Sequence, residues 1–190
     1  MAAIESEAPK MKKALVVVGT LLSILFVFIV FPVAYWYVSR LVDRGIGIPA
    51  GTVSMAVSYI LTGLSWSVGL FWILWSYSYL IFVGSGSPVE AFGVALEPTT
   101  KLVTAGPYAY VRNPLVFGFL FILLGVAFLA NSLSGIAMVP LVGLIIATYL
   151  RLFEEKELKR RFGEAYEHYR HYVPMIVPRF NPYAPQAKMA

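Results

Sequence analysis

The sequence contains no cysteine, and it has few charged residues for its length of 190 residues. Without cysteine, the chain has no disulfide, no thiolate metal ligand and no cysteine nucleophile. Charged residues make up 13% of the chain and hydrophobic residues 59%, whereas about 25% of the residues are charged in an ordinary soluble domain. A soluble domain of this size cannot bury so much apolar surface, and disordered, collagen-like and coiled-coil chains have other compositions. The composition therefore predicts an integral membrane protein.

Charge is absent from three long stretches, residues 14–39, 45–89 and 113–150. Because about 20 residues of helix cross the hydrocarbon, the first stretch predicts one span, and the other two have room for more than one. The first is too long for the core of a signal peptide and lacks a cleavage site, so we expect a retained helix. The second predicts one long helix over about residues 50–83, or two helices if that stretch is broken.

The third stretch divides into two short helices, residues 115–130 and 135–150, whose brief connection predicts an antiparallel hairpin. Residues 151–172 are polar with one apolar side, which predicts an amphipathic helix. Pro174 and Pro178 end this helix, and we expect the last residues to form a frayed tail. The fold class is thus all-α: a polytopic transmembrane helical bundle of four or five spans with a C-terminal amphipathic helix.

The net charge of +5 comes from basic residues that cluster beside the predicted spans. This placement is typical of membrane edges rather than of nucleic-acid binding. With four spans, the lysines of residues 10–13, the loop 84–113 and the basic cluster 159–161 lie on one side, which the positive-inside rule predicts to be cytoplasmic. We expect the active site on this face. Residues 1–88 then form N-terminal membrane helices, and residues 89–190 form a C-terminal catalytic region with the hairpin and a cofactor pocket.

Two polar segments flank the hairpin, and both carry spaced motifs. The first segment reads G-x-Y-x-x-x-R-N-P-x-x-x-G from Gly106 to Gly118, and the second reads E-E-x-x-L from Glu154, F-G-x-x-Y-x-x-Y from Phe162 and V-P at Val173. In order and spacing, the combination resembles the isoprenylcysteine carboxyl methyltransferase family. That family belongs to a wider group of small membrane methyltransferases that includes phospholipid amine methyltransferases. The resemblance covers about residues 96–178. The family often has histidine where this chain has Asn113, and asparagine cannot serve as an acid or base.

The resemblance implies an S-adenosylmethionine-dependent methyltransferase whose lipophilic acceptor enters from the bilayer, among the membrane lipids. The expected acceptor is the carboxylate of a prenylated cysteine. Because this group is ionised at neutral pH, its methylation needs no general base, whereas an amine acceptor needs one. The alternatives are a methyltransferase for phospholipid amines, a small NADPH-dependent membrane reductase, and a channel or assembly factor without enzymatic activity. Neither a nucleic acid nor a metal is expected as a partner.

The resemblance also implies which residues of the first segment line the cofactor pocket: Lys101, Leu102, Val103, Tyr108, Asn113, Pro114, Leu115 and Val116. In the second segment, Glu154 and Glu155 suit the cationic groups of the cofactor, because a carboxylate at a membrane boundary needs a cationic partner. The alternative is a solvated helix with ion pairs between Glu155 and Lys159 and between Glu157 and Arg161.

The catalytic candidates are Arg112, Arg151 and Glu154. Either arginine is placed to orient a substrate carboxylate, and Arg112 has an alternative role as an anchor at the membrane edge. Glu154 or its neighbour would serve as the base for an amine acceptor. We expect the lipid-side opening of the site between the hairpin and a neighbouring span, beside Phe117 and Gly118.

Overall fold

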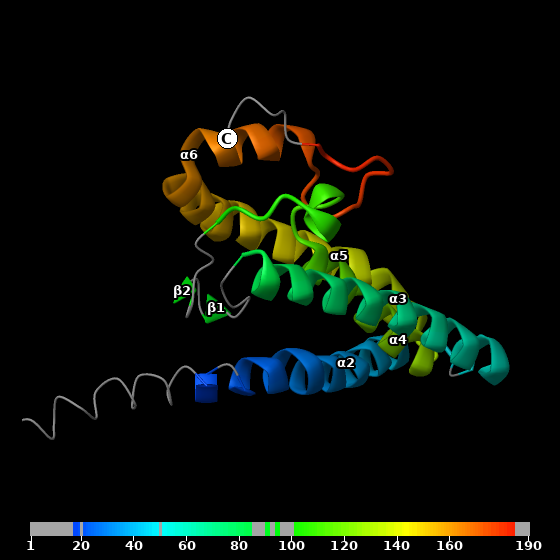
Figure 1. Ribbon diagram of the computed structural model, residues 1–190. Helices are drawn as coiled ribbons and strands as arrows, with labels where there is room; N and C mark the ends of the chain where they lie inside the picture. Colours follow the sequence, from blue (N-terminus) through cyan, green and yellow to red (C-terminus); the bar gives the residue numbers. More distant parts are fainter. Residues whose placement is uncertain are drawn as a thin grey trace, which may run out of the picture.

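The computed structural model describes residues 17–19, 21–49, 51–84, 90–91, 94–95 and 101–184 (Figure 1). Its helical elements are η1 (Phe26–Val30), α2 (Phe31–Gly45), α3 (Met55–Phe82), η2 (Gly106–Ala109), α4 (Pro114–Leu129), α5 (Leu133–Tyr149), η3 (Leu150–Glu154) and α6 (Glu155–Tyr172). Of these, η1 and η3 are π-helical turns and η2 is a 3-10 turn. Two short strands, β1 (Glu90–Ala91) and β2 (Val94–Ala95), form one antiparallel pair. The predicted all-α class is confirmed, while the lysines of residues 10–13 lie outside the described residues.

Three helical stretches are long and apolar enough to cross a membrane, Val17–Gly45, Met55–Phe82 and Leu133–Tyr172. A fourth apolar helix, α4, is shorter. The charge-free stretch at residues 45–89 contains α3 as a single helix of 28 residues, so the structure favours four apolar helices over five. Many large apolar side chains of α2 and α3 are exposed, which is typical of surfaces that face lipid. The chain is an integral membrane protein.

Helices α3 and α4 approach each other closely at two glycines. A Cβ atom on Gly118 would lie 2.7 Å from the carbonyl oxygen of Gly69, and one on Gly69 would lie 2.8 Å from that of Gly118. Small residues permit such close backbone contact between membrane helices. Phe117 packs on Trp72 of α3, with 5.1 Å between the ring centroids. The expectation of a lipid-side opening at Phe117 and Gly118 is therefore wrong, because both residues belong to the α3–α4 contact.

The turn between α4 and α5 is fixed to the neighbouring helices at the other end of the bundle. Asn131 adopts a positive φ of 49°. Its side-chain amide donates hydrogen bonds to the Val53 carbonyl (2.6 Å) and the Ser58 hydroxyl (3.0 Å), and its oxygen accepts one from the Val53 amide (3.1 Å). Asp43 of α2 accepts a hydrogen bond from the Ser134 amide at 3.0 Å. The predicted hairpin is thus held against both preceding helices.

The C-terminal helix is not separate from the hairpin. The chain continues from α5 through η3 into α6 with no boundary at Arg151, and it reverses direction inside α6 instead (Figure 1). The reversal occurs at Gly163, where φ is 56° and ψ is −130°. Glycine reaches this conformation at little cost because it has no Cβ atom. Both halves of α6 consequently lie near the segment that precedes α4.

The segment after α6 is held by backbone hydrogen bonds to the residues before α4. The amide of Arg112 donates to the Pro174 carbonyl (2.9 Å), and that of Asn113 donates to the Met175 carbonyl (3.1 Å). In the other direction, the amide of Arg179 donates to the Tyr110 carbonyl (3.0 Å), and that of Tyr183 donates to the Ala109 carbonyl (2.8 Å). The expectation of a frayed tail is therefore wrong for residues 179–183, and residues 185–190 lie outside the described residues. The two prolines correctly indicated the end of the helix, but they carry no information about this pairing.

Candidate active site

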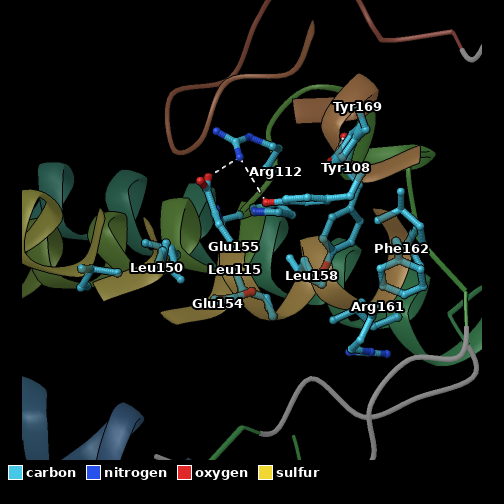
Figure 2. A pocket seen from close by; sticks show the side chains of 18 of the residues that line it. Tyr108, Arg112, Leu115, Leu150, Glu154, Glu155, Leu158, Arg161, Phe162 and Tyr169 are labelled. Carbon is cyan, nitrogen blue, oxygen red and sulfur yellow. Dashed lines mark hydrogen bonds and ion pairs between the residues drawn. The ribbon is translucent and has the colours of Figure 1, made fainter. Parts of the chain in front are cut away.

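A cavity of about 450 Å³ lies between the residues before α4 and the two halves of α6 (Figure 2). Its volume falls within the range of about 300–1,000 Å³ that is typical of small-molecule sites. The polar segments contribute charged and aromatic side chains, among them Arg112, Glu154 and Arg161. The apolar spans contribute Val27 and Ile146. The cavity is thus bordered both by groups suited to a polar ligand and by groups suited to an apolar one.

Most of the residues predicted for the cofactor pocket line this cavity. They are Leu102, Val103, Tyr108, Asn113, Pro114, Leu115, Val116, Glu154 and Glu155. Lys101 is not among the lining residues and is exposed. Of the catalytic candidates, Arg112 and Glu154 line the cavity, whereas Arg151 does not and is exposed. The structure brings these residues together, and their roles stay predictions.

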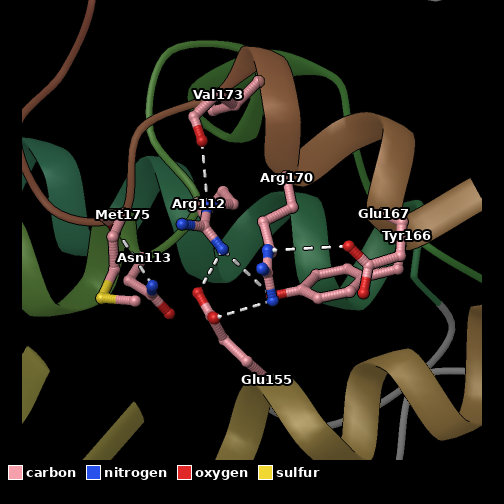
Figure 3. Close-up of polar contacts among 8 residues, drawn as sticks. All are labelled: Arg112, Asn113, Glu155, Tyr166, Glu167, Arg170, Val173 and Met175. Atoms are coloured by element: carbon pink, nitrogen blue, oxygen red, sulfur yellow. Dashed lines mark hydrogen bonds and ion pairs between the residues drawn. The ribbon is translucent and has the colours of Figure 1, made fainter. Parts of the chain in front are cut away.

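Two of the candidates, Arg112 and Glu155, are bound to each other (Figure 3). Their side chains are 11% and 7% exposed, respectively. The Arg112 Nη1 group donates to Glu155 Oε1 and to the Tyr166 hydroxyl (3.2 Å), and its Nε donates to the Val173 carbonyl (2.9 Å). Glu155 Oε2 accepts a further hydrogen bond from Arg170 Nη1 at 3.4 Å. Glu155 is therefore held between two guanidinium groups, so its charge is already compensated within the protein.

The ion pairs of this helix differ in part from those predicted for a solvated helix. Glu157 accepts hydrogen bonds from Arg160 at 2.8 and 2.9 Å, and Arg161 also acts on it electrostatically. Lys159 pairs with Glu167 across the Gly163 turn, with 2.7 Å between Nζ and Oε1. The turn changes the partners because it brings the second half of α6 back onto the first half.

Asn113 and Tyr108 have structural contacts of their own. The Asn113 side chain donates to the Met175 carbonyl at 3.0 Å, and Pro114 occupies the first turn of α4. The Tyr108 carbonyl accepts a hydrogen bond from the Tyr169 hydroxyl at 2.7 Å. Burial, together with the nearby Tyr169 and Glu154, raises the pKa of the Tyr108 hydroxyl, so this group stays protonated at neutral pH. Tyr108 is thus available to donate a hydrogen bond rather than to act as a base.

Several lining residues were missed by the sequence analysis. Phe162, Tyr166 and Tyr169 belong to the recognised F-G-x-x-Y-x-x-Y pattern, but the pattern alone does not indicate that its two halves face each other. Val27 lies in η1, the π-helical turn just before Pro32, and Leu80 lies near the end of α3. Proline cannot donate to the helical ladder, and π-helical turns occur often at functional sites. No signal in an apolar stretch distinguishes a lining residue from one that faces lipid.

Comparison with known proteins gives one family match. A model of a family described as phospholipid methyltransferase matches residues 57–165, which is more than half of the chain. Over 78 residues, the chain is 35% identical to a methanethiol S-methyltransferase of Crocosphaera subtropica, covering 41% of this chain and 29% of that protein. Over 86 residues, it is 39% identical to protein-S-isoprenylcysteine O-methyltransferase B of Arabidopsis thaliana, covering 45% of this chain and 43% of that protein. The alignments thus span less than half of either relative, and no solved structure matches the chain.

Proposed function

Since the chain belongs to the phospholipid methyltransferase family, we propose that it transfers a methyl group from S-adenosylmethionine to a lipophilic acceptor within the cavity. The observation that carries the proposal is the dual lining of this cavity, in which charged side chains from the polar segments meet apolar side chains from the spans. The family match argues against the reductase and the non-enzymatic alternatives. It covers α3, α4, α5, η3 and the first half of α6, which form most of the cavity wall.

The lining suits S-adenosylmethionine, which carries an ammonium, a carboxylate, a sulfonium and an adenine. Glu154 offers a carboxylate for the cationic groups, and Arg161 offers a guanidinium for the carboxylate. Leu102 and Val103 offer apolar surface for the adenine. When bound, the cofactor supplies an electrophilic methyl group.

The protein's own contribution is to bind, orient and shield the reactants. Burial of Tyr108 and Tyr169 at the cavity wall limits the access of water, and oriented groups in a site with little water favour a displacement reaction. We assign the carboxylate of a prenylated cysteine as the acceptor, and the Arabidopsis relative is named as an O-methyltransferase of protein S-isoprenylcysteine. A carboxylate acceptor needs no base, in agreement with a protonated Tyr108 and a Glu155 engaged by arginines.

The acceptor would reach the cavity from the bilayer, and the cofactor would reach it from the cytoplasm. Val27 and Ile146 line the cavity, and their neighbours Phe26 and Ile145 are 56% and 68% exposed on lipid-facing helix surfaces. We therefore place the lipid-side opening between η1 and the end of α5. A polar cofactor would not use this route, because the transfer of charged groups into hydrocarbon is costly.

The direct test is a methyl-transfer assay with the purified protein in nanodiscs and radiolabelled S-adenosylmethionine. A farnesylated cysteine analogue, phosphatidylethanolamine and a small aliphatic thiol serve as competing acceptors. We expect label in the farnesylcysteine product, and alkali should release it as methanol, because methyl esters hydrolyse and N-methyl groups do not. Label in the lipid amine or the thiol alone would assign a different acceptor, and no transfer to any of the three would contradict the proposal.

A further inference from the structure

The segment after α6 exposes large apolar side chains although its backbone is well held. Val177 is 71% exposed and Phe180 is fully exposed at 100%. Between and around them, backbone hydrogen bonds fix Pro174, Met175 and Arg179 to the residues before α4. The segment therefore holds two large apolar side chains at fixed positions outside the core.

The hydrogen bonds also place this segment at the level where an apolar helix begins. The carbonyls of Pro174 and Met175 accept from the backbone amides of Arg112 and Asn113, and the next residue starts α4. The Asn113 side chain also donates to the Met175 carbonyl (Figure 3). The sequence of α4, Pro114–Leu129, contains no charged residue. The segment therefore lies beside the boundary between the polar and the apolar parts of the molecule.

The side chains around Phe180 are those of a membrane interface. Tyr172 is 48% exposed and stacks on Tyr183, with 6.0 Å between the ring centroids. Arg179 donates to the Tyr172 carbonyl at 2.8 Å, and Arg170 has a side chain that is 43% exposed. Tyrosines are enriched at the level of lipid headgroups, and arginines are attracted to anionic lipids there.

We propose that residues 173–183 dock on the surface of the bilayer in which the protein resides, with Val177 and Phe180 inserted at the boundary between headgroups and acyl chains. Arg179 lies at the headgroups and is complementary to anionic lipids, whereas Arg170 is paired with Glu155 and Glu167. The inference is independent of the proposed function. Because the docked segment is bonded to Arg112 and Asn113, which line the cavity, it anchors one wall of the cavity to the membrane surface.

The absence of cysteine permits a clean test with a single fluorescent label. Phe180→Cys and Val177→Cys are each labelled with an environment-sensitive nitrobenzoxadiazole dye and placed one copy per nanodisc, in discs of phosphatidylcholine with phosphatidylglycerol. The matched control is Glu164→Cys, an exposed position beside the turn in α6. The wild-type side chains are exposed at all three positions, so the substitutions remove no core packing.

We expect blue-shifted emission at positions 180 and 177, and quenching by aqueous iodide about threefold or more weaker than at position 164, as for side chains inserted about 5–10 Å into the interface. Lipids with a nitroxide on the upper acyl chain should quench positions 180 and 177 only. Equal iodide quenching at all three positions would overturn the proposal. A blue shift that requires two copies in one disc would also overturn it, because contact between copies would then bury the segment.

Discussion

Removing one partner of the Arg112–Glu155 pair should destabilise the protein strongly. The two side chains are 11% and 7% exposed, so either charge is poorly hydrated once its partner is gone. The loss of one member of a buried pair typically costs about 3–5 kcal/mol. Replacing both members by apolar residues of similar size leaves neither charge without its partner. The loss of stability in such a double variant is typically much smaller than the sum of the losses in the two single variants.

The magnitude can be measured with a double-mutant cycle made of Arg112→Met, Glu155→Leu and the double variant. The free energy of unfolding is taken from urea titrations in detergent micelles, and we expect an interaction energy of about 2–3 kcal/mol. Glu157→Leu is the matched control, because Glu157 pairs with Arg160 at the surface, where the side chains are 35% and 76% exposed. This control should change stability little, since surface ion pairs contribute little.

Two results would refute the reasoning. If the losses of the single variants add without interaction in the double variant, the pair does not stabilise the fold. If Glu155→Leu costs no more than Glu157→Leu, burial of the carboxylate has no energetic consequence. Either result would leave the position of α6 over the cavity without its main electrostatic support.

Three further predictions concern the cavity and its surroundings. Glu154→Gln should weaken adenosylhomocysteine binding at least about tenfold in calorimetry, since it removes a charged partner, while Glu157→Gln should not; equal affinities would contradict a ligand role. Val27→Trp should raise the KM for a farnesylated acceptor and leave adenosylhomocysteine affinity unchanged, because it narrows only the lipid-side opening; a fall in both affinities would indicate one shared entrance. Gly163→Ala should lower the free energy of unfolding by about 1–3 kcal/mol, because alanine is strained at this positive φ. Gly63→Ala in α3 is the control, since a Cβ atom there also meets open space, and it should not lower stability. Equal effects of the two substitutions would show that the α6 turn is not strained.

The helices were predictable because the distribution of charge determines them. Long apolar stretches without charge are suited to the hydrocarbon, and their lengths limit the number of spans. The turn at Gly163 was not predictable, since an isolated glycine in a helical pattern costs only about 1 kcal/mol relative to alanine and is usually tolerated. The pairing of residues 173–183 with residues 109–113 depends on that turn, so the sequence could not indicate this pairing either.

The spacing of the motifs predicted most residues of the candidate site. It did not predict which of these residues contact each other in the folded protein. Arg151 precedes Glu154 by three residues, but closeness in sequence does not fix the face of a helix, and Arg151 is exposed. The partners Arg112 and Glu155 are 43 residues apart, and no local pattern joins them.

The ion pair also changes what Arg112 can do for a substrate. Arginine has five N–H donors, and three of those on Arg112 are used by Glu155, Tyr166 and the Val173 carbonyl. These bonds fix the plane of the guanidinium at the cavity wall. The two N–H donors of Nη2 therefore already have a fixed direction before a substrate binds. A role in orienting an acceptor carboxylate is therefore compatible with the ion pair. The two roles predict different losses, since Glu155 substitutions should reduce stability first, whereas a loss of the Nη2 donors should raise the KM for the acceptor.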